Sequence, residues 1–145
     1  MTAPNSKISE EPKNGLYSGA MNDGEAEGVG KEIFANGNSY QGLYENGNRH
    51  GLGLSVFNNG NSYFGEFRNG YRNGHFHVIF ANGYTYAGDF KDDRKHGYGV
   101  ATYPSGEAYS GQFKAGKRHG FGTFTFSDGT IYKGVFENGH IKGDE

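Results

Sequence analysis

Two histidines one residue apart, His75 and His77, are the residues of this sequence best suited to bind a metal ion. They lie in the apolar run NGHFHVIFANG, and alternate residues of a strand share a face, so both imidazoles would point to the same side. Glu66 or Asp89 would lie on a neighbouring strand and complete a two-His-one-carboxylate site. No second acid, base or nucleophile accompanies them. A structural role is therefore the stronger interpretation, and the metal site is a weak candidate.

The other motifs that suggest chemistry are weaker. His50, His96 and His119 each precede a glycine. In a sheet they would lie about 10 Å or more apart, too far to share one metal, so we expect packing or hydrogen-bonding roles. The GLG, GYG and GFG motifs lack the following helix and acidic residue of a dinucleotide site. Cysteine is absent, so there is no thiolate nucleophile. We predict a non-enzymatic protein without a cofactor.

The composition excludes several other classes of protein. The chain has 145 residues, a net charge of -2, a mean hydropathy of -0.81 and 27 glycines. Nucleic-acid binding is not expected, because it needs a broad cationic surface. There is no apolar signal region and no run of about 18 apolar residues. We therefore expect a cytoplasmic protein.

Tyrosines recur every 23 residues through the chain, which indicates a repeat protein. Counting each tyrosine as position 1, glycine returns at positions 3, 8, 12, 14 and 21. The main departures are Phe76 at position 14, Asp93 at position 8 and Met21 at the aromatic position 5. The repeats begin at Tyr17, Tyr40, Tyr63, Tyr86, Tyr109 and Tyr132, and the last one is truncated.

The pattern Y-x-G-x-F-x-x-G-x-x-x-G-x-G resembles the MORN (membrane occupation and recognition nexus) repeat, and the resemblance covers residues 17–145. It implies a short protein made only of MORN repeats. It also implies a scaffold for a cytoskeletal, ciliary or myosin-tail partner, or else a peripheral module for anionic phospholipids. MORN arrays also precede kinase or methyltransferase domains, for which these 145 residues leave no room. The resemblance makes association with the cytoskeleton or a cilium an expectation.

The residues themselves predict an all-β fold. Positions 1, 3 and 5 alternate as in a strand with one apolar face, and positions 13 to 18 form a second strand. Asn-Gly and Asp-Gly pairs between them favour tight hairpin turns. We predict one elongated antiparallel β-meander over residues 17–145, built of 23-residue hairpins, after a disordered tail at residues 1–16.

The aromatic residues that recur at the same positions of successive repeats have two interpretations. The stronger one is that the rings are the core and lie over the bare glycines of neighbouring strands. The other is a groove of glycine and aromatic residues that binds a protein partner as a peptide or helix. The candidate partner-binding residues are Tyr40, Tyr63, Tyr86, Tyr109, Phe67, Phe90, Phe113 and Phe76. Phe76, where other repeats have glycine, is expected to mark a bend or specificity point.

A column of cations at position 10 and its neighbours predicts a basic stripe along one sheet edge. It is either a solvated surface or a site for lipid headgroups or an acidic protein. Its residues are Arg49, Arg72, Arg94, Lys95, Lys117 and Arg118. The open last strand of repeat six would also be an unpaired edge, which predicts an end-to-end homodimer.

Overall fold

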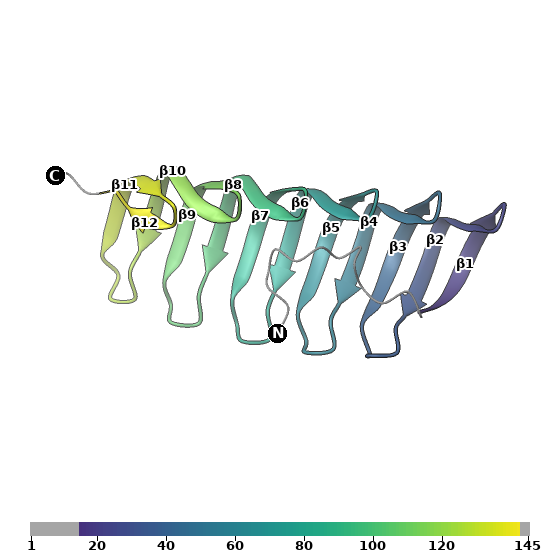
Figure 1. The fold of residues 1–145 in the computed structure, drawn as a ribbon. Helices are drawn as coiled ribbons and strands as arrows, with labels where there is room; N and C mark the ends of the chain where they lie inside the picture. Colours follow the sequence, from purple (N-terminus) through teal and green to yellow (C-terminus); the bar gives the residue numbers. More distant parts are fainter. Residues whose placement is uncertain (1–14, 143–145) are drawn as a thin grey trace.

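The computed structural model describes residues 15–142 as one antiparallel sheet whose twelve strands follow one another in chain order (Figure 1). The strands are β1 (Leu16–Asn22), β2 (Glu25–Ile33), β3 (Ser39–Glu45), β4 (Asn48–Val56), β5 (Ser62–Arg68), β6 (Tyr71–Ile79), β7 (Thr85–Lys91), β8 (Arg94–Thr102), β9 (Ala108–Lys114), β10 (Lys117–Thr125), β11 (Ile131–Glu137) and β12 (His140–Ile141). The predicted all-β meander is confirmed, and the described residues contain no helix that could cross a membrane. Residues 1–14 of the predicted tail and the last three residues of repeat six lie outside the described part, and Leu16 already belongs to β1.

Two-residue turns join the two strands of each hairpin. These turns line up along one long edge of the sheet, where the strands end, and the longer loops line up along the opposite long edge. In Asn46 and Gly47 both φ angles are positive, 52° and 82°. This is the type I′ conformation, whose twist matches that of the paired strands. The Asn-Gly pairs at positions 20 and 21 lie instead in longer loops along the opposite edge. In the first of these, Phe34 N donates to Asn38 O and Gly37 N donates to Phe34 O, both over 2.9 Å.

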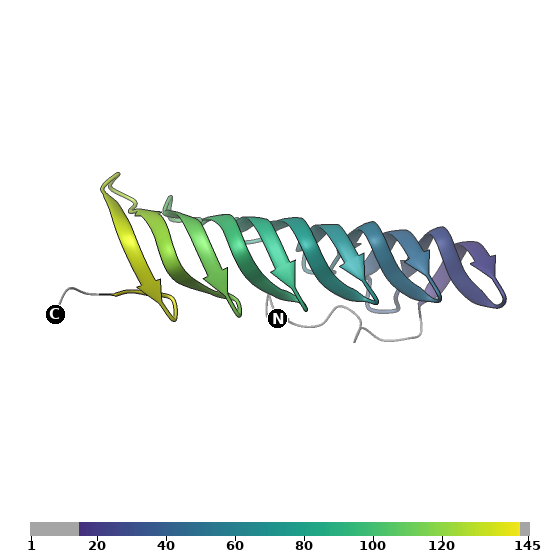
Figure 2. The same ribbon diagram turned by 90° about the horizontal axis from the view of Figure 1, so that it is seen from above.

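Each strand bends toward its aromatic side. In a straight strand the Cα atoms of positions 1 and 5 are about 13 Å apart, and side chains that stand straight out from the strand keep that separation. The rings of Tyr40 and Tyr44 converge instead, with their centroids 5.2 Å apart. The pairing register shifts between Gly42 and Tyr44, and Gly51 on the partner strand has a φ of 98°, which an L side chain rarely adopts. Views at right angles show the bend, because one part of each strand faces the viewer in Figure 1 and the other part in Figure 2.

A row of glycines across the sheet makes room for the tyrosine rings inside the bend. Gly30, Gly42, Gly53 and Gly65 are cross-strand partners in turn, and the row continues to Gly134 with one interruption at Phe76. A Cβ on Gly53 would overlap the Tyr40 ring. The predicted packing of rings over bare backbone is therefore confirmed.

The rings form the core of the described residues. All eight residues proposed as partner anchors are buried, with relative exposures of 0–5%. Rings contact edge to face both within a repeat, as Tyr109 with Phe113 (5.1 Å), and between repeats, as Tyr109 with Phe136 (5.0 Å). The bend covers the apolar face without a helix or a partner. The core interpretation is thus confirmed, and the expectation that these rings are a contact surface is wrong.

Phe76 takes the place that a tyrosine ring holds in other repeats. It is fully buried and packs against Phe67 and Phe90, with centroids 5.1 and 5.2 Å away. Tyr63 packs instead toward the loop edge, against Phe57 and Phe80 (5.6 and 6.1 Å). The substitution therefore moves a neighbouring ring sideways, as the volume of a second ring demands.

We predict that Phe76→Gly lowers the free energy of unfolding by about 1–3 kcal/mol, less than the 3–5 kcal/mol usual for the loss of a buried Phe. The loss is small because Tyr63 can move into the vacated space. In a Tyr63→Ala background the same substitution should cost about 2 kcal/mol more. Urea denaturation of the four variants measures this, and an equal cost in both backgrounds would contradict the exchange of rings.

Candidate binding surfaces

The cations at position 10 are part of the core. Arg49, Arg72 and Lys95 are buried, and Arg118 is partly buried. The turn occupies only positions 7 and 8, so position 10 lies within a strand, opposite the position-5 ring, as Arg72 is opposite Phe67. Its side chain therefore points inward. The predicted basic stripe is wrong at these positions.

Each of these cations lies over aromatic faces. The guanidinium carbon of Arg49 is 4.5 Å from the Tyr40 centroid, and that of Arg72 is 4.5 Å from Tyr63 and 4.8 Å from Phe90. An aromatic face attracts a cation most strongly when both are removed from water. The cations thus bridge rings of adjacent repeats.

Asp93 replaces a turn glycine because it pairs with the buried Arg72. One carboxylate oxygen, Oδ1, accepts hydrogen bonds from Arg72 N (2.7 Å) and Arg72 Nε (3.3 Å), while Arg72 Nη2 donates to the Asp93 carbonyl (3.0 Å). Both side chains are 1% exposed. Asp tolerates the positive φ of 70° found there. This departure from the repeat ties repeats three and four together.

A different set of cations is exposed along the edge of the hairpin turns. Arg94 and Lys117 are exposed as predicted, and their cross-strand partners Lys91 and Lys114 are exposed cations as well. Sequence reasoning missed the position-6 cations, although they form a column of their own. We name Arg68, Lys91, Arg94, Lys114 and Lys117 the cationic edge.

The histidine pair lies on the outer face, away from the rings. The ring centroids of His75 and His77 are 5.4 Å apart, and His75 Nδ1 is 3.5 Å from Asp89 Oδ1. Residues 15–142 contain no group of three His, Cys, Asp or Glu side chains placed to hold a metal. His50 accepts a hydrogen bond from Asn69 N (3.3 Å), which agrees with the structural role expected of it.

The outer face also exposes large apolar side chains, which the sequence pattern did not single out. Val29 pairs with Leu43, and Leu54 pairs with Phe64, across neighbouring strands. Phe64 is 48% exposed and Leu52 52%. We name Val29, Leu43, Leu52, Leu54 and Phe64 the outer apolar patch.

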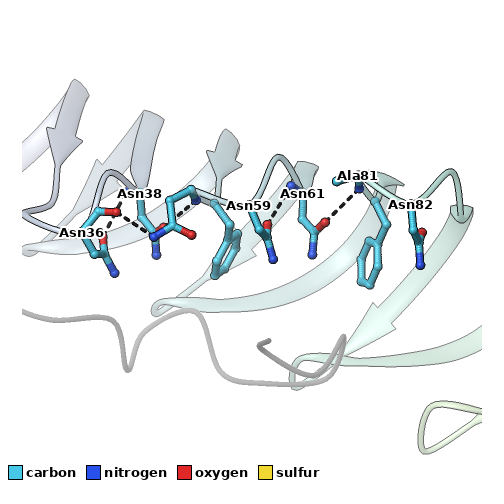
Figure 3. Close-up of a pocket in the computed structure, with 9 residues that line it drawn as sticks. Asn36, Asn38, Asn59, Asn61, Ala81 and Asn82 are labelled. Atoms are coloured by element: carbon cyan, nitrogen blue, oxygen red, sulfur yellow. Dashed lines mark hydrogen bonds between the residues drawn. The ribbon is translucent and has the colours of Figure 1, made fainter.

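The edge opposite the hairpin turns carries a groove of about 770 Å³. Asparagine amides and two phenylalanine rings line it, and Figure 3 shows the amides following one another from loop to loop. The lining residues are Asn36, Asn38, Phe57, Asn58, Asn59, Asn61, Phe80, Ala81 and Asn82. Sequence reasoning missed this loop groove. Its signal is the asparagine at position 20 of the first three repeats.

Comparison with known proteins gives matches to a repeat family and to a solved structure. The sequence matches the MORN repeat at residues 17–39, 40–62, 63–75, 86–108 and 109–131, and the third match ends just before Phe76. No curated protein matches the sequence. The TCP domain of Drosophila melanogaster SAS-4 (dCPAP), solved with a proline-rich motif of Ana2 (dSTIL), is 15% identical with a TM-score of 0.47. That match covers 76% of this chain and 61% of the other.

We predict that Lys95 makes stability depend on pH. Burial, and secondarily Arg72, lower the pKa of Lys95 from its ordinary 10.5 to about 8. Between these values the unfolded chain binds more protons, so stability rises with pH. Relative to Lys95→Met, the free energy of unfolding should increase by about 1–2 kcal/mol from pH 7.5 to 9.5.

Chemical denaturation at each pH measures the dependence. The measurements stop below pH 10 because tyrosines then begin to ionise in the unfolded chain. Burial raises the pKa of Tyr40 and Tyr109 in the folded protein from 10.0 to about 12. The folded protein therefore binds more protons than the unfolded chain above pH 10, and stability falls again. Parallel pH profiles for the two proteins would contradict the prediction.

Proposed function

The chain belongs to the MORN repeat family, and on that premise we propose that it is a non-enzymatic scaffold that binds a protein partner through the outer apolar patch. MORN repeats suggest a protein or membrane interaction module. The observation that carries the choice is the two exposed apolar cross-strand pairs on the outer face, Val29–Leu43 and Leu54–Phe64. Exposed apolar side chains gathered on one face mark interaction sites.

The patch suits a partner that presents apolar side chains to the convex outer side of the bent sheet. Its members stand on adjacent strands of a continuous sheet, so they are held in place before binding. Burying the exposed half of a Leu or Phe side chain contributes about 1 kcal/mol. Five such residues would supply a contact of moderate strength. A cytoskeletal, ciliary or myosin-tail partner in the cytoplasm is part of this proposal.

We expect Leu54→Ser combined with Phe64→Ser to abolish recovery of the partner. Affinity purification from the native cell, with the bound proteins quantified by mass spectrometry, compares this variant with the wild-type chain. Ile131→Ser is the matched control, because it removes an exposed apolar side chain on β11, roughly 30 Å away across seven strands. A partner profile unchanged by the Leu54 and Phe64 substitutions would contradict the proposed surface.

A second candidate function, binding to an anionic membrane, is supported by the cationic edge. Its five exposed cations lie on one side of the sheet, and each contributes about 1 kcal/mol near an anionic bilayer. Arg49, Arg72 and Lys95 cannot take part while they are buried. An end-to-end homodimer stays a prediction, in which β1 and β12, the terminal strands of the described sheet, offer their outer edges.

Sedimentation with phosphatidylserine-containing vesicles tests the membrane candidate. Binding should fall steeply with salt and be lost when Lys91, Arg94 and Lys117 are changed to Glu. Changing the exposed Lys31, Lys133 and Lys142 to Glu alters the net charge equally and should preserve binding. Equal losses in both variants would indicate a general charge effect and reject the cationic edge as the site.

A further inference from the structure

Three asparagines at position 20 present a row of hydrogen-bond donors along the loop groove. In each, the side-chain oxygen Oδ1 accepts the backbone N–H two residues later: Asn36 from Asn38 (3.0 Å), Asn59 from Asn61 (3.0 Å) and Asn82 from Tyr84 (2.9 Å). Only an oxygen can accept from an N–H, so these bonds fix the orientation of all three amides. The Nδ2 groups then point the same way, out of the loops, as Figure 3 shows.

A second set of hydrogen bonds holds the loops in register. Asn38 Oδ1 accepts from Asn58 N (2.8 Å), and Asn61 Oδ1 accepts from Ala81 N (2.9 Å). Asn58 Nδ2 also donates to Asn36 O over 2.7 Å. Each loop is thereby tied to the next, and the donor row is set before any ligand arrives. A ligand that fits the row would lose little energy to reorganisation of the protein.

The spacing of the donors selects the conformation of the ligand. Equivalent atoms of successive repeats are two strands apart, about 9.6 Å. A polyproline II helix has three residues per turn at 3.1 Å each, so equivalent groups recur about every 9.3 Å. Groups on one side of a β-strand recur about every 6.7 Å, and an α-helix returns to one face after about 10.5 Å, or seven residues. Over two intervals only the polyproline II helix stays within about 1 Å of the donors.

The chemistry of the groove fits such a helix. Its backbone makes no internal hydrogen bonds, so its carbonyl oxygens are available as acceptors. Phe57, which is half-buried, presents part of its ring to the groove between the amides, whereas Phe80 lines the groove but is only 5% exposed. A partly exposed aromatic ring such as Phe57 is the kind of side chain that receives a proline ring in polyproline-binding sites.

We propose that the loop groove binds a proline-rich protein segment in the polyproline II conformation. Every third carbonyl of the segment accepts a hydrogen bond from Asn36, Asn59 and Asn82 in turn, so about seven residues span the site. In the next two repeats the same position holds Ser105 and Asp128, so the amide row ends at repeat three. This site is distinct from the outer apolar patch and goes beyond the function proposed above.

The test is fluorescence anisotropy with a labelled nine-residue polyproline peptide. We expect saturable binding, no binding of a Gly-Ser peptide of equal length, and at least about tenfold weaker binding to Asn59→Asp, since one donor becomes a repelling oxygen. The variant is compatible with the fold, because Asp128 already accepts from Thr130 N (2.9 Å) at position 20. Asn69→Asp makes the same charge change on the opposite edge, where Asp23 and Asp92 occupy the equivalent turn position, and should bind like wild type.

Side-chain amide signals in ¹⁵N NMR locate the peptide independently, and those of Asn36, Asn59 and Asn82 should shift on titration. No binding at millimolar peptide, equal binding of the Gly-Ser peptide, or full binding by Asn59→Asp would overturn the proposal. So would binding of an oligosaccharide to these amides without any binding of polyproline. The Leu54→Ser and Phe64→Ser variant should retain peptide binding, so failure of this site and failure of the outer apolar patch are separable.

Discussion

The tyrosine ring laid over two bare glycines is the contact on which the rest of this sheet depends. Tyr109 covers Gly111 on its own strand and Gly122 on the next, and its hydroxyl donates to the carbonyl of Gln112 over 2.7 Å. That reach is possible only if the strand bends at the third residue, and the bend brings the position-5 ring against the tyrosine. A single-layer sheet thereby encloses its own apolar core, which otherwise requires a second layer.

Enclosing the core determines which surfaces remain for partners. The rings and the position-10 cations fill the inside of the bend in residues 15–142, so the eight rings proposed as partner anchors are not available to a ligand. The cationic edge, the outer apolar patch and the loop groove lie on the two edges and the outer face. Each extends over several repeats, because side chains at the same position of successive repeats lie side by side on the surface of a repeat protein.

The two departures from the repeat, Phe76 and Asp93, change the side-chain contacts around them. Phe76 displaces Tyr63 toward the loop edge, next to the rings that line the loop groove. Asp93 gives Arg72 a buried carboxylate partner, whereas Arg118 donates to the main-chain oxygen of Gly139 (2.6 Å). Both changes act within one or two repeats, because a repeat contacts only its neighbours.

The sequence by itself determined the meander, its 23-residue unit and the packing of rings over glycine, because these follow from residue spacing along the chain. It did not show that position 10 points inward. That depends on the two-residue turn and the bend, which place Arg72 opposite Phe67 and beneath Phe90. Nor did it show that Asn36, Asn59 and Asn82 present parallel donors, since hydrogen bonds within folded loops fix their amides. Spacing along the chain thus predicted the strands, while side-chain direction was decided only by contacts between repeats.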